Sequence, residues 1–521
     1  MSIIDQIIHF LSDFSAVMLF PVITAILLFL FFYYYSKTFQ PQQITTEWVF
    51  IRINNPGISF INQRYPMSKR DVTPLVIITL IFTILAVVNL GNTGKVNVLE
   101  EIRNPSVNRT HMSNLSFDEI YFVRTAVEHL ENVNPYEISH PPLGKEIIAA
   151  SIITFGMSPF GWRMFGAIFG VLMLVVIYIF IKNMFGRTVI ATCGTLLLGF
   201  DFMRFVQTRI ATIDAFVVLF ILLAYFFMYR HITTNPNAPF RKSVLPLALS
   251  GLFFGLSFAT KWTGFYAGAG LLIIYIIRLV KLYSYYDSAK KSGFSMYLLK
   301  TLLSSVLFFV FIPAVIYYLT YIPYGLARGY TLEGGMLLSR EFFDIVWGNQ
   351  VLMFDYHSQL VAEHPFSSTW WQWILNIRPI LYVHEISDYT QARFGAFGNP
   401  FVWWGGFLAI AMMAVRVFTH RDGKALFILI GYLAQLLPWV MVTRILFAYH
   451  YFPSSLFLVL ALAHVFNTIV ERWKESGKSA IYAYTAVTGS LFALFYPMLA
   501  GMFLPFWYFS SLLKWFASWP L

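Results

Sequence analysis

Long apolar runs with almost no charge recur along this chain, and they constrain its fold more than any other feature. They fall at residues 75–88, 164–181, 215–228, 298–321 and 446–465. Most approach the roughly 20 residues that an α-helix needs to cross a bilayer. They are apolar on every side, whereas barrel strands alternate apolar and polar residues. We therefore expect an all-α polytopic membrane protein with about 12 transmembrane helices, since helices satisfy their own backbone within lipid.

The distribution of charge predicts the orientation of these helices. Hydrophobic residues make up 58% of the chain and charged residues 12%, with a net charge of +11. The basic residues gather in every second loop: Arg52, Arg64, Lys69 and Arg70; Lys182 and Arg187; Arg230, Arg241 and Lys242; Lys281, Lys290 and Lys291; Arg416, Arg421 and Lys424; Arg472, Lys474 and Lys478. Such loops are typically cytoplasmic, so we expect the longer loops 91–146 and 323–396, and both chain ends, on the outside. This pattern indicates a cell-membrane protein and no nucleic-acid partner.

The domain organisation follows from the same spans. Residues 1–72 read as an additional N-terminal transmembrane helix, at 16–35, with a polar cytoplasmic connection. Residues 73–521 read as one membrane domain. The outer loop 323–396 is rich in Trp and Tyr, which favour the membrane interface. We expect that loop to be partly helical and to lie against the outer leaflet and the mouth of the bundle.

Charge and histidine interrupt the apolar pattern at residues 116–147, "SFDEIYFVRTAVEHLENVNPYEISHPPLGKEI". The adjacent carboxylates Asp118 and Glu119 follow one predicted span, and His140 and Lys145 precede the next. The other unusual polar residues at the predicted outer ends of spans are Arg163, Arg209, Asp214, Lys261, Arg444, Tyr449 and His450. Charges at such positions are destabilising unless they line a polar cavity. We therefore predict one outward-facing site.

The residue types indicate the chemistry of that site. Guanidinium groups bind phosphate in bidentate fashion, and a carboxylate can remove a proton from a hydroxyl nucleophile. A phosphate leaving group needs charge stabilisation rather than an acid, which favours electrostatic catalysis. The pattern indicates a substrate with an anionic part and a nucleophile that must lose a proton. In a single displacement at a sugar carbon, one carboxylate would activate the acceptor while the cations hold the departing phosphate.

Structural interpretations of the same residues remain open at this stage. Asp118 and Glu119 can form the acidic first turn of a helix capped by Ser116. Arg209 and Asp214 can form an internal salt bridge, and Lys261 can extend its ammonium from a helix end to the interface. His357 and His364 can share one helix face, but a zinc site requires further ligands. We therefore expect neither a metal nor a cofactor.

Eight phrases, in order, carry a family resemblance: "FDEIYF", "HPPLGK", "FGWRMFGAIFGV", "TRIATIDAF", "FATKWTGF", "YHSQLVAEHPFSSTWWQWILNIRPI", "GNPFVWWGG" and "RILFAYHYFPSSLFL". From about residue 75 to the C-terminus the chain resembles the protein O-mannosyltransferase family. The resemblance implies a GT-C type glycosyltransferase fold for residues 73–521. It also implies transfer of mannose from a polyprenyl-phosphate donor, with inversion, to Ser or Thr hydroxyls of a secreted or membrane protein at the extracytoplasmic face.

The resemblance also implies roles for individual residues. Asp118 would be the general base, and Glu119 would orient the site. The donor phosphate and substrate would be bound or supported by Arg378, Arg444, Gln359, His357, Arg163, Arg209, Asp214, His140, Lys145 and Lys261.

Two departures from the eukaryotic pattern affect these expectations. Only about seventy residues separate the spans around the second outer loop, too few for the β-trefoil MIR domain of eukaryotic members together with its helices. Together with the extra N-terminal span, this indicates a bacterial-type member with undecaprenyl or another polyprenyl phosphate as lipid. Acceptor recognition must therefore differ from that of the eukaryotic members. The resemblance implies that the sugar is mannose or another hexose.

Two alternatives remain. The acceptor can be a lipid or a cell-wall glycan, or the chain can transport lipid-linked sugars. A transporter should show two repeated halves with broken helices around a midplane site, whereas the charges here cluster at one side. The sequence predicts no oligomeric state.

Overall fold

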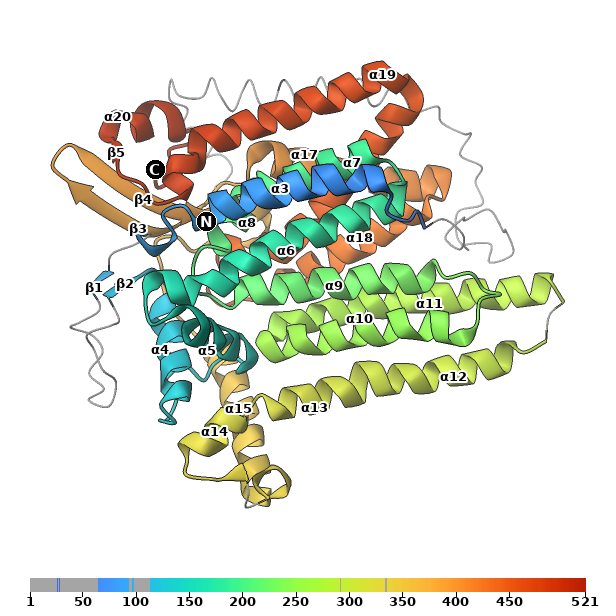
Figure 1. The fold of residues 1–521 in the computed structure, drawn as a ribbon, viewed down its shortest axis with the longest axis horizontal. Coiled ribbons are helices and arrows are strands. Elements are labelled where there is room, and N and C mark those ends of the chain that lie inside the picture. Colours follow the sequence, from blue (N-terminus) through green and yellow to red (C-terminus); the bar gives the residue numbers. More distant parts are fainter. Residues whose placement is uncertain are drawn as a thin grey trace.

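The computed structural model describes residues 26, 28, 64–92, 96–97, 113–290, 292–332 and 335–521. Long helices lie side by side along one direction and form the body of the molecule (Figure 1). The α-helices are α3 (Lys69–Val87), α4 (Glu119–Leu130), α5 (Leu143–Phe155), α6 (Pro159–Phe185), α7 (Thr188–Gly199), α8 (Phe202–Gln207), α9 (Asp214–Ile232), α10 (Phe240–Thr260), α11 (Phe265–Ser288), α12 (Phe294–Val306), α13 (Ile312–Leu319), α14 (Ile322–Ala327), α15 (Arg340–Gln359), α16 (Trp370–Ile374), α17 (Pro400–His420), α18 (Gly423–Leu436), α19 (Phe452–Leu499) and α20 (Phe506–Tyr508). The strands are β1 (Val96–Asn97), β2 (Ser113–Leu115), β3 (Ile380–Ser387), β4 (Thr390–Ala396) and β5 (Leu504–Pro505).

Within the described residues, nine helical stretches are long and apolar enough to cross a membrane. They are Lys69–Asn92, Pro159–Phe185, Asp214–Ile232, Phe240–Thr260, Trp262–Ser288, Phe294–Ala327, Pro400–His420, Gly423–Val440 and Ala448–Leu499. The last contains 52 residues and reverses at Lys474, whose φ of 52° and ψ of −116° are not helical. It therefore supplies two passes, and the shorter apolar helix α7 lies beside them. The predicted helical bundle is confirmed.

The predicted span at 16–35 falls almost entirely outside the described residues, so the extra N-terminal element stays a prediction. Helix α3 begins at Lys69, and the boundary expected at residue 72 falls inside its first turn. Ser68 and Asp71 form a reciprocal capping box that fixes this start, since each satisfies backbone donors of the first turn.

The centre of the bundle consists of helices that are apolar all round. Helix α9 packs on α10, α6 and α11, and the first half of α19 packs on α17, α18 and α7. Both are almost completely buried, as expected for helices without a polar face. Helices α3 and α12 are largely exposed, and their apolar side chains are suited to contact with lipid.

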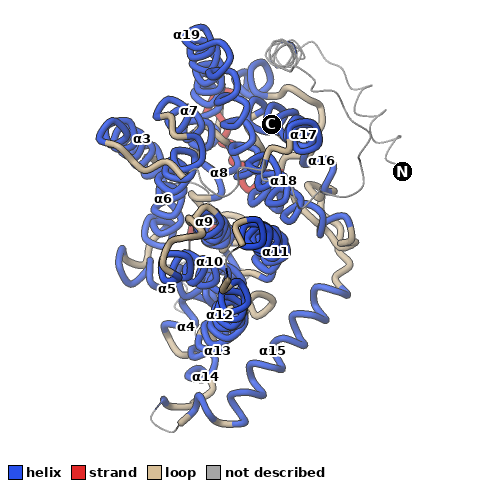
Figure 2. Tube along the Cα trace, turned by 90° about the vertical axis from the view of Figure 1, so that its right-hand side faces the viewer, coloured by secondary structure: helices blue, strands red, loops and turns tan. Residues whose placement is uncertain are grey.

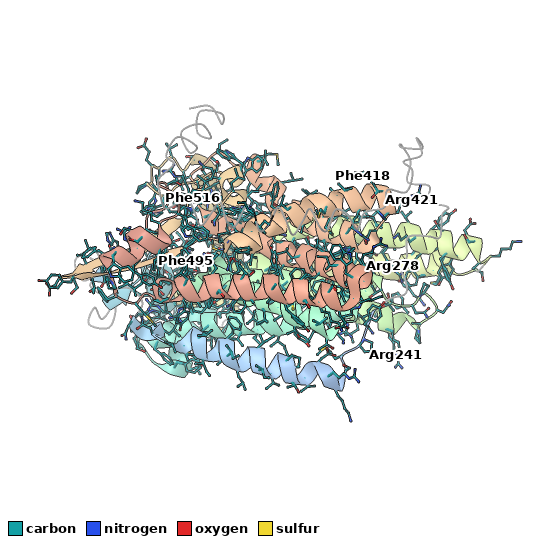
Figure 3. The ribbon with its side chains drawn as sticks, turned by 90° about the horizontal axis from the view of Figure 1, so that it is seen from above. Arg241, Arg278, Phe418, Arg421, Phe495 and Phe516 are labelled. Carbon is teal, nitrogen blue, oxygen red and sulfur yellow. The ribbon has the colours of Figure 1, made fainter. Side chains whose placement is uncertain are left out.

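The two ends of the bundle differ. The turns that follow α6, α9, α11 and α17 lie at one end, on the right in Figure 1. Figure 3 shows Arg241, Arg278 and Arg421 toward that end and Phe495 and Phe516 toward the other. The opposite end carries α4, α5, α14 to α16 and the strands. The basic turns thus share one end, as the charge pattern predicts.

In the parts that the structure describes, both loops predicted to be outer contain regular secondary structure. Loop 323–396 is partly helical, as predicted, but it also contains the hairpin β3–β4, to which β5 adds in the order β3–β4–β5, all antiparallel. This small sheet was not predicted, because β5 joins from more than a hundred residues away. Helix α15 lies across the direction of the spans and stands apart from the bundle (Figure 2).

Candidate active site

The segment that ends at Asp118 enters helix α4 through an unusual backbone turn. Phe117 has a φ of 51°, in the left-handed region that residues other than glycine seldom adopt. Such a conformation costs on the order of 1–3 kcal/mol and persists only where surrounding contacts enforce it. The Phe117 ring packs on Tyr382, with centroids 4.7 Å apart, and edge-on against Phe447. This turn places Asp118 immediately before the first residue of α4.

Glu119 is fully buried and bonded entirely to protein groups. Its two oxygens accept from Arg163 Nε and Nη2, both at 2.7 Å, in a bidentate pair. They also accept from the backbone N–H of Ser116 at 2.6 Å and of Ala211 at 2.7 Å. The Ser116 contact has the spacing of the predicted capping box, but α4 begins at Glu119 with Asp118 as its N-cap, so Ser116 does not cap the helix. Glu119 thus ties the α4 entrance to α6 and to the segment before α9, which suits an orienting role.

Arg163 and Arg209 both hold the end of α3. Arg163 donates to the Leu90 carbonyl at 2.9 Å in addition to its pair with Glu119. Arg209 donates to the carbonyls of Leu85, Ala86 and Val88 at 3.0, 2.5 and 2.7 Å. Terminal helix carbonyls have no partner within the helix, so cations there are stabilising. Both guanidinium groups therefore form hydrogen bonds to the protein's own backbone.

Asp118 differs sharply from Glu119. No residue that the structure describes forms a hydrogen bond or ion pair with its carboxylate. Burial raises the pKa of Asp118 to about 7, the Lys261 cation lowers it, and the carboxylates of Asp214 and Glu137 raise it. A carboxylate with a pKa near neutrality, and with no protein partner, can accept a proton from a bound molecule.

Asp214 and Lys261 form a buried ion pair beside Asp118. Asp214 begins α9, Lys261 ends α10, and Lys261 Nζ lies 2.8 Å from Asp214 Oδ1. The ammonium also lies 5.3 Å from the centroid of the Tyr449 ring. The possible ion pair between Arg209 and Asp214 is wrong, because Arg209 binds α3 and Asp214 binds Lys261. Lys261 likewise points inward and does not extend to the interface.

A second cluster forms the wall behind Asp118. Lys145 Nζ donates to Glu137 Oε2 at 2.7 Å and to the carbonyls of Glu137 and His140. Glu137 Oε1 lies 2.9 Å from His140 Nδ1. Burial would raise the pKa of Glu137, but the charges of Lys145 and His140 hold it well below its usual range. Sequence reasoning missed Glu137, because one acid in a polar loop carries no distinguishing signal until its partners are placed.

Helix α15 adds His357 to this wall. His357 Nε2 lies 2.8 Å from the Ser139 carbonyl, and its ring is edge-on to His140 at 5.4 Å. Burial and the nearby charges of His140 and Arg444 lower the pKa of His357 to about 4, so it is neutral at pH 7. His140 and His357, which belong to two different phrases of the family resemblance, are in contact here.

The three remaining predicted donor residues lie in different settings. Arg444 is partly buried, and its charge acts on Tyr356, His357 and Tyr449. Phe447 and Tyr449, which follow Arg444 closely in the chain, contact the Phe117 ring at 6.2 and 6.3 Å, so the Arg444 segment lies against the turn that carries Asp118. Gln359 is exposed on α15.

Arg378 is also exposed, and its guanidinium donates to the Pro365 carbonyl at 3.0 Å. Next to Pro365, the His364 ring contacts Phe117 at 6.5 Å. The described contacts therefore connect Arg378 to the Asp118 turn through a loop and not directly.

Tyr382 and Tyr449 also lie near Asp118, with their rings against Phe117. The sequence analysis gives neither of them a role in donor binding. Tyr382 donates to Gln207 Oε1 at 3.1 Å while its ring packs on Phe117. Aromatic residues are too frequent in this chain to stand out singly. Among the described residues, no group of three or more His, Cys, Asp or Glu side chains is arranged to hold a metal ion.

Comparisons with known proteins bear on the family and the fold. Residues 108–324 match the family described as "Dolichyl-phosphate-mannose-protein mannosyltransferase", and residues 342–519 match the "C-terminal four TMM region of protein-O-mannosyltransferase". These two matches together cover most of the chain.

Similar proteins include two bacterial polyprenol-phosphate-mannose–protein mannosyltransferases. The protein from Mycobacterium tuberculosis is 24% identical over 490 residues, covering 82% of this chain and 88% of the relative. That from Corynebacterium glutamicum is 25% identical over 467 residues, covering 77% and 88%.

Two solved structures share the fold. The Pmt1-Pmt2 complex of S. cerevisiae, bound to the sugar donor, matches with a TM-score of 0.74 at 13% identity, over 90% of this chain and 95% of that one. ArnT from Cupriavidus metallidurans, bound to undecaprenyl phosphate, matches with a TM-score of 0.51 at 16% identity, over 81% and 64%. The predicted GT-C fold is confirmed.

Proposed function

The chain belongs to the protein O-mannosyltransferase family, and we propose that it moves mannose, or another hexose, from polyprenyl phosphate to Ser or Thr hydroxyls of proteins. The observation that carries this proposal is the Asp118 carboxylate. It has a pKa near 7, accepts no hydrogen bond from the described protein, and lies on the turn whose Phe117 ring contacts Phe447 and Tyr449, close behind Arg444 in the chain. The relatives named for this reaction in Mycobacterium tuberculosis and Corynebacterium glutamicum support it.

The proposed reaction is one displacement. Asp118 takes the proton from the acceptor hydroxyl as its oxygen attacks the anomeric carbon. The carbon–oxygen bond to the phosphate breaks, and its electron pair leaves with polyprenyl phosphate, so the anomeric carbon is inverted. Arg444 stabilises the charge of the departing phosphate, as fixed cations do where charge develops. No residue role here requires a metal or cofactor.

The remaining polar residues act on these two groups. Lys261 and Asp214 set the ionisation of Asp118, and Glu119 with Arg163 fixes the turn that carries it. His140, Lys145 and His357 form the wall on the α15 side. Arg209 supports this frame by holding the end of α3.

The proposal includes a location. Basic turns at one end of the bundle favour the cytoplasm, which puts Asp118 at the extracytoplasmic face of the cell membrane. The acceptor would then be a secreted or membrane protein, and the donor would reach the site from the bilayer. No nucleic acid takes part.

Purified protein tests the function directly. We expect incubation with polyprenyl-phosphate mannose and a Ser/Thr-rich peptide to increase the peptide mass by one hexose. The same donor offered with a lipid or glycan acceptor provides the comparison. Transfer only to those acceptors, or movement of intact donor across vesicles without transfer, would replace the proposal with one of the two alternatives.

The pH dependence should follow the ionisation of Asp118. The base acts only when deprotonated, so kcat/KM should rise with pH through about 7. Lys261→Met removes the cation that lowers this pKa and should move the midpoint to higher pH. Asp214→Asn removes an anion that raises it and should move the midpoint to lower pH. A midpoint that moves in the same direction in both variants would contradict the role of Asp118 as base.

Arg444 should contribute to binding of the donor. We expect Arg444→Ala to raise the donor KM by about 10- to 100-fold, because a charge-assisted hydrogen bond contributes roughly 1.5–3 kcal/mol. Arg378→Ala is the matched comparison, since Arg378 is exposed and bound to Pro365. A larger effect at Arg378 than at Arg444 would assign the phosphate to the Pro365 side of the site.

A further inference from the structure

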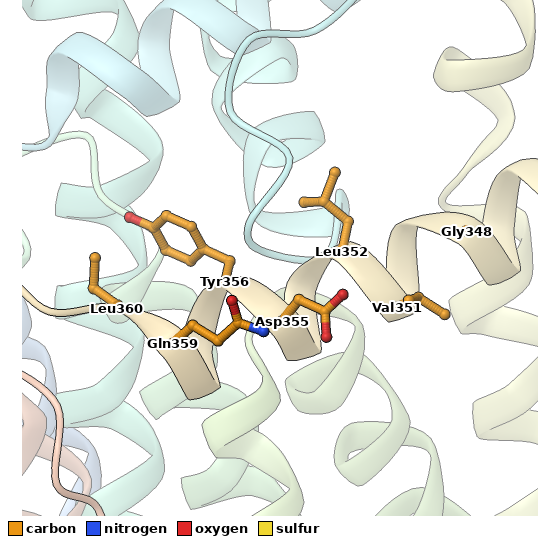
Figure 4. Close-up of a pocket in the computed structure, with 7 residues that line it drawn as sticks. All are labelled: Gly348, Val351, Leu352, Asp355, Tyr356, Gln359 and Leu360. Atoms are coloured by element: carbon orange, nitrogen blue, oxygen red, sulfur yellow. The ribbon is translucent and has the colours of Figure 1, made fainter.

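Helix α15 carries an open groove of about 560 Å³ along one side (Figure 4). Its lining residues are Gly348, Val351, Leu352, Asp355, Tyr356, Gln359 and Leu360. Counted from Gly348, they fall at positions i, i+3, i+4, i+7, i+8, i+11 and i+12, so they form one face of the helix. The groove face is open, whereas the neighbouring face of α15 is anchored.

The anchored face fixes the groove in place. Phe342, Val346, Asn349 and Met353 are buried. Asn349 donates to the Ile138 carbonyl at 2.9 Å and accepts from the Tyr321 hydroxyl at 2.7 Å. Helix α15 is therefore bonded both to the loop that carries His140 and to the end of α13. The groove has a defined position relative to Asp118.

One end of the groove reaches the proposed active site. Tyr356 lines the groove and is acted on by the charges of Asp118 and Arg444. His357, the next residue, contacts Ser139 and His140 behind Asp118. Gly348 marks the other end, about 12 Å from Tyr356 along the helix at 1.5 Å per residue. A molecule lying in the groove would thus lead into the site.

The lining chemistry indicates the class of that molecule. Val351, Leu352 and Leu360 offer apolar contact, but the exposed Asp355 and Gln359 lie among them. A hydrocarbon chain would leave the carboxylate and amide without partners, and a phosphate would be repelled by Asp355. An extended polypeptide supplies N–H donors, carbonyls and apolar side chains together. At about 3.3 Å per residue, the groove accommodates roughly five of its residues.

We propose that the α15 groove binds the acceptor polypeptide in extended conformation and delivers its Ser or Thr to Asp118. This inference rests on the proposed function and adds the subsite that selects the acceptor. Asp355 favours a Lys or Arg in the flanking sequence, because a charge opposite a carboxylate improves binding and discriminates between partners. The groove also offers a recognition surface in a chain whose second outer loop is too short for a β-trefoil domain.

Gly348 provides a steric test. A Cβ atom at this position would meet nothing within 4 Å, so a larger side chain occupies the groove without disturbing the protein. Glycine is also a poor residue in a helix interior, so Gly348→Leu should not lower the thermal unfolding midpoint. With a Ser/Thr peptide of about ten residues, kcat/KM should fall about tenfold, a loss of roughly 1.4 kcal/mol in binding. A peptide of about three residues does not reach Gly348 and should be affected much less.

Three further variants complete the experiment. Ser358→Leu adds the same side chain to an exposed position of α15 outside the groove, and it should leave both peptides unaffected. Leu352→Trp narrows the groove at a second place and should reproduce the length dependence. Asp355→Asn should reduce the preference for peptides flanked by Lys over those flanked by Glu.

The possible outcomes distinguish failure of the groove proposal from failure of the proposed function. If Gly348→Leu raises the donor KM and not the peptide KM, the groove holds the polyprenyl chain and the inference is overturned. An equal loss for short and long peptides also overturns it. If the unmodified protein transfers no hexose to either peptide, the proposed function itself fails, whatever the variants show.

Discussion

Asp118→Asn should reduce transfer by about 10²- to 10⁴-fold, the usual contribution of a positioned general base. The amide keeps the shape of the side chain but cannot take the proton of the acceptor hydroxyl. Because the Asp118 carboxylate makes no hydrogen bond to the described protein, its replacement breaks no structural contact. The thermal unfolding midpoint and donor binding should therefore stay close to those of the unmodified protein. The measurement is kcat with saturating donor and peptide.

Glu131→Gln is the matched control for this prediction. Glu131 lies just beyond the other end of α4 and is exposed, so the same chemical change there should leave kcat unaltered. If Asp118→Asn retains full activity, another group must activate the acceptor. The proposed mechanism would then be wrong even though the family assignment stands.

Arg163→Ala should have the largest effect on stability. It leaves Glu119 as a buried carboxylate without its cation, and breaking a buried pair in this way costs about 3–5 kcal/mol. We expect a strongly lowered thermal unfolding midpoint in detergent and a low yield of folded protein. The Leu90 carbonyl also loses its donor, which loosens the end of α3.

The double variant Glu119→Gln/Arg163→Met distinguishes a structural role from a substrate-binding one. Removing both charges avoids the uncompensated carboxylate, so part of the lost stability should return, giving a large coupling energy in the cycle. An Arg163→Ala protein of normal stability that fails to bind donor would instead place this guanidinium against the phosphate.

The sequence predicted the membrane body well because the physical cause is local. A run of about twenty apolar residues must form a membrane-spanning helix wherever it occurs. The reversal inside α19 was also predictable, since Arg472, Lys474 and Lys478 interrupt the apolar run there. The β3–β4–β5 sheet was not, because strand pairing with β5 depends on contacts between distant segments.

The same distinction between local patterns and contacts between distant segments applies to the site. Asp118, His140 and Arg444 could be singled out as polar residues that an apolar chain keeps near the ends of its spans. The ion pairs of the site could not be assigned from the sequence. Asp214 and Lys261 are 47 residues apart, and nothing local distinguishes that pair from Arg209 with Asp214. Arg163 and Arg209 were chosen as possible substrate contacts for their charge. Their guanidinium groups serve helix ends and a buried carboxylate, a use that residue type alone does not reveal.

Helix α3 links the site to its surroundings. It exposes most of its apolar side chains, yet its last carbonyls are held by Arg209 and the turn after it by Arg163, the residue that also holds Glu119. A helix in contact with lipid tilts or shifts when the hydrocarbon thickness changes. The outer surface of the bundle and the turn that carries Asp118 are thus mechanically coupled through Arg163, whose guanidinium bonds both Leu90 and Glu119.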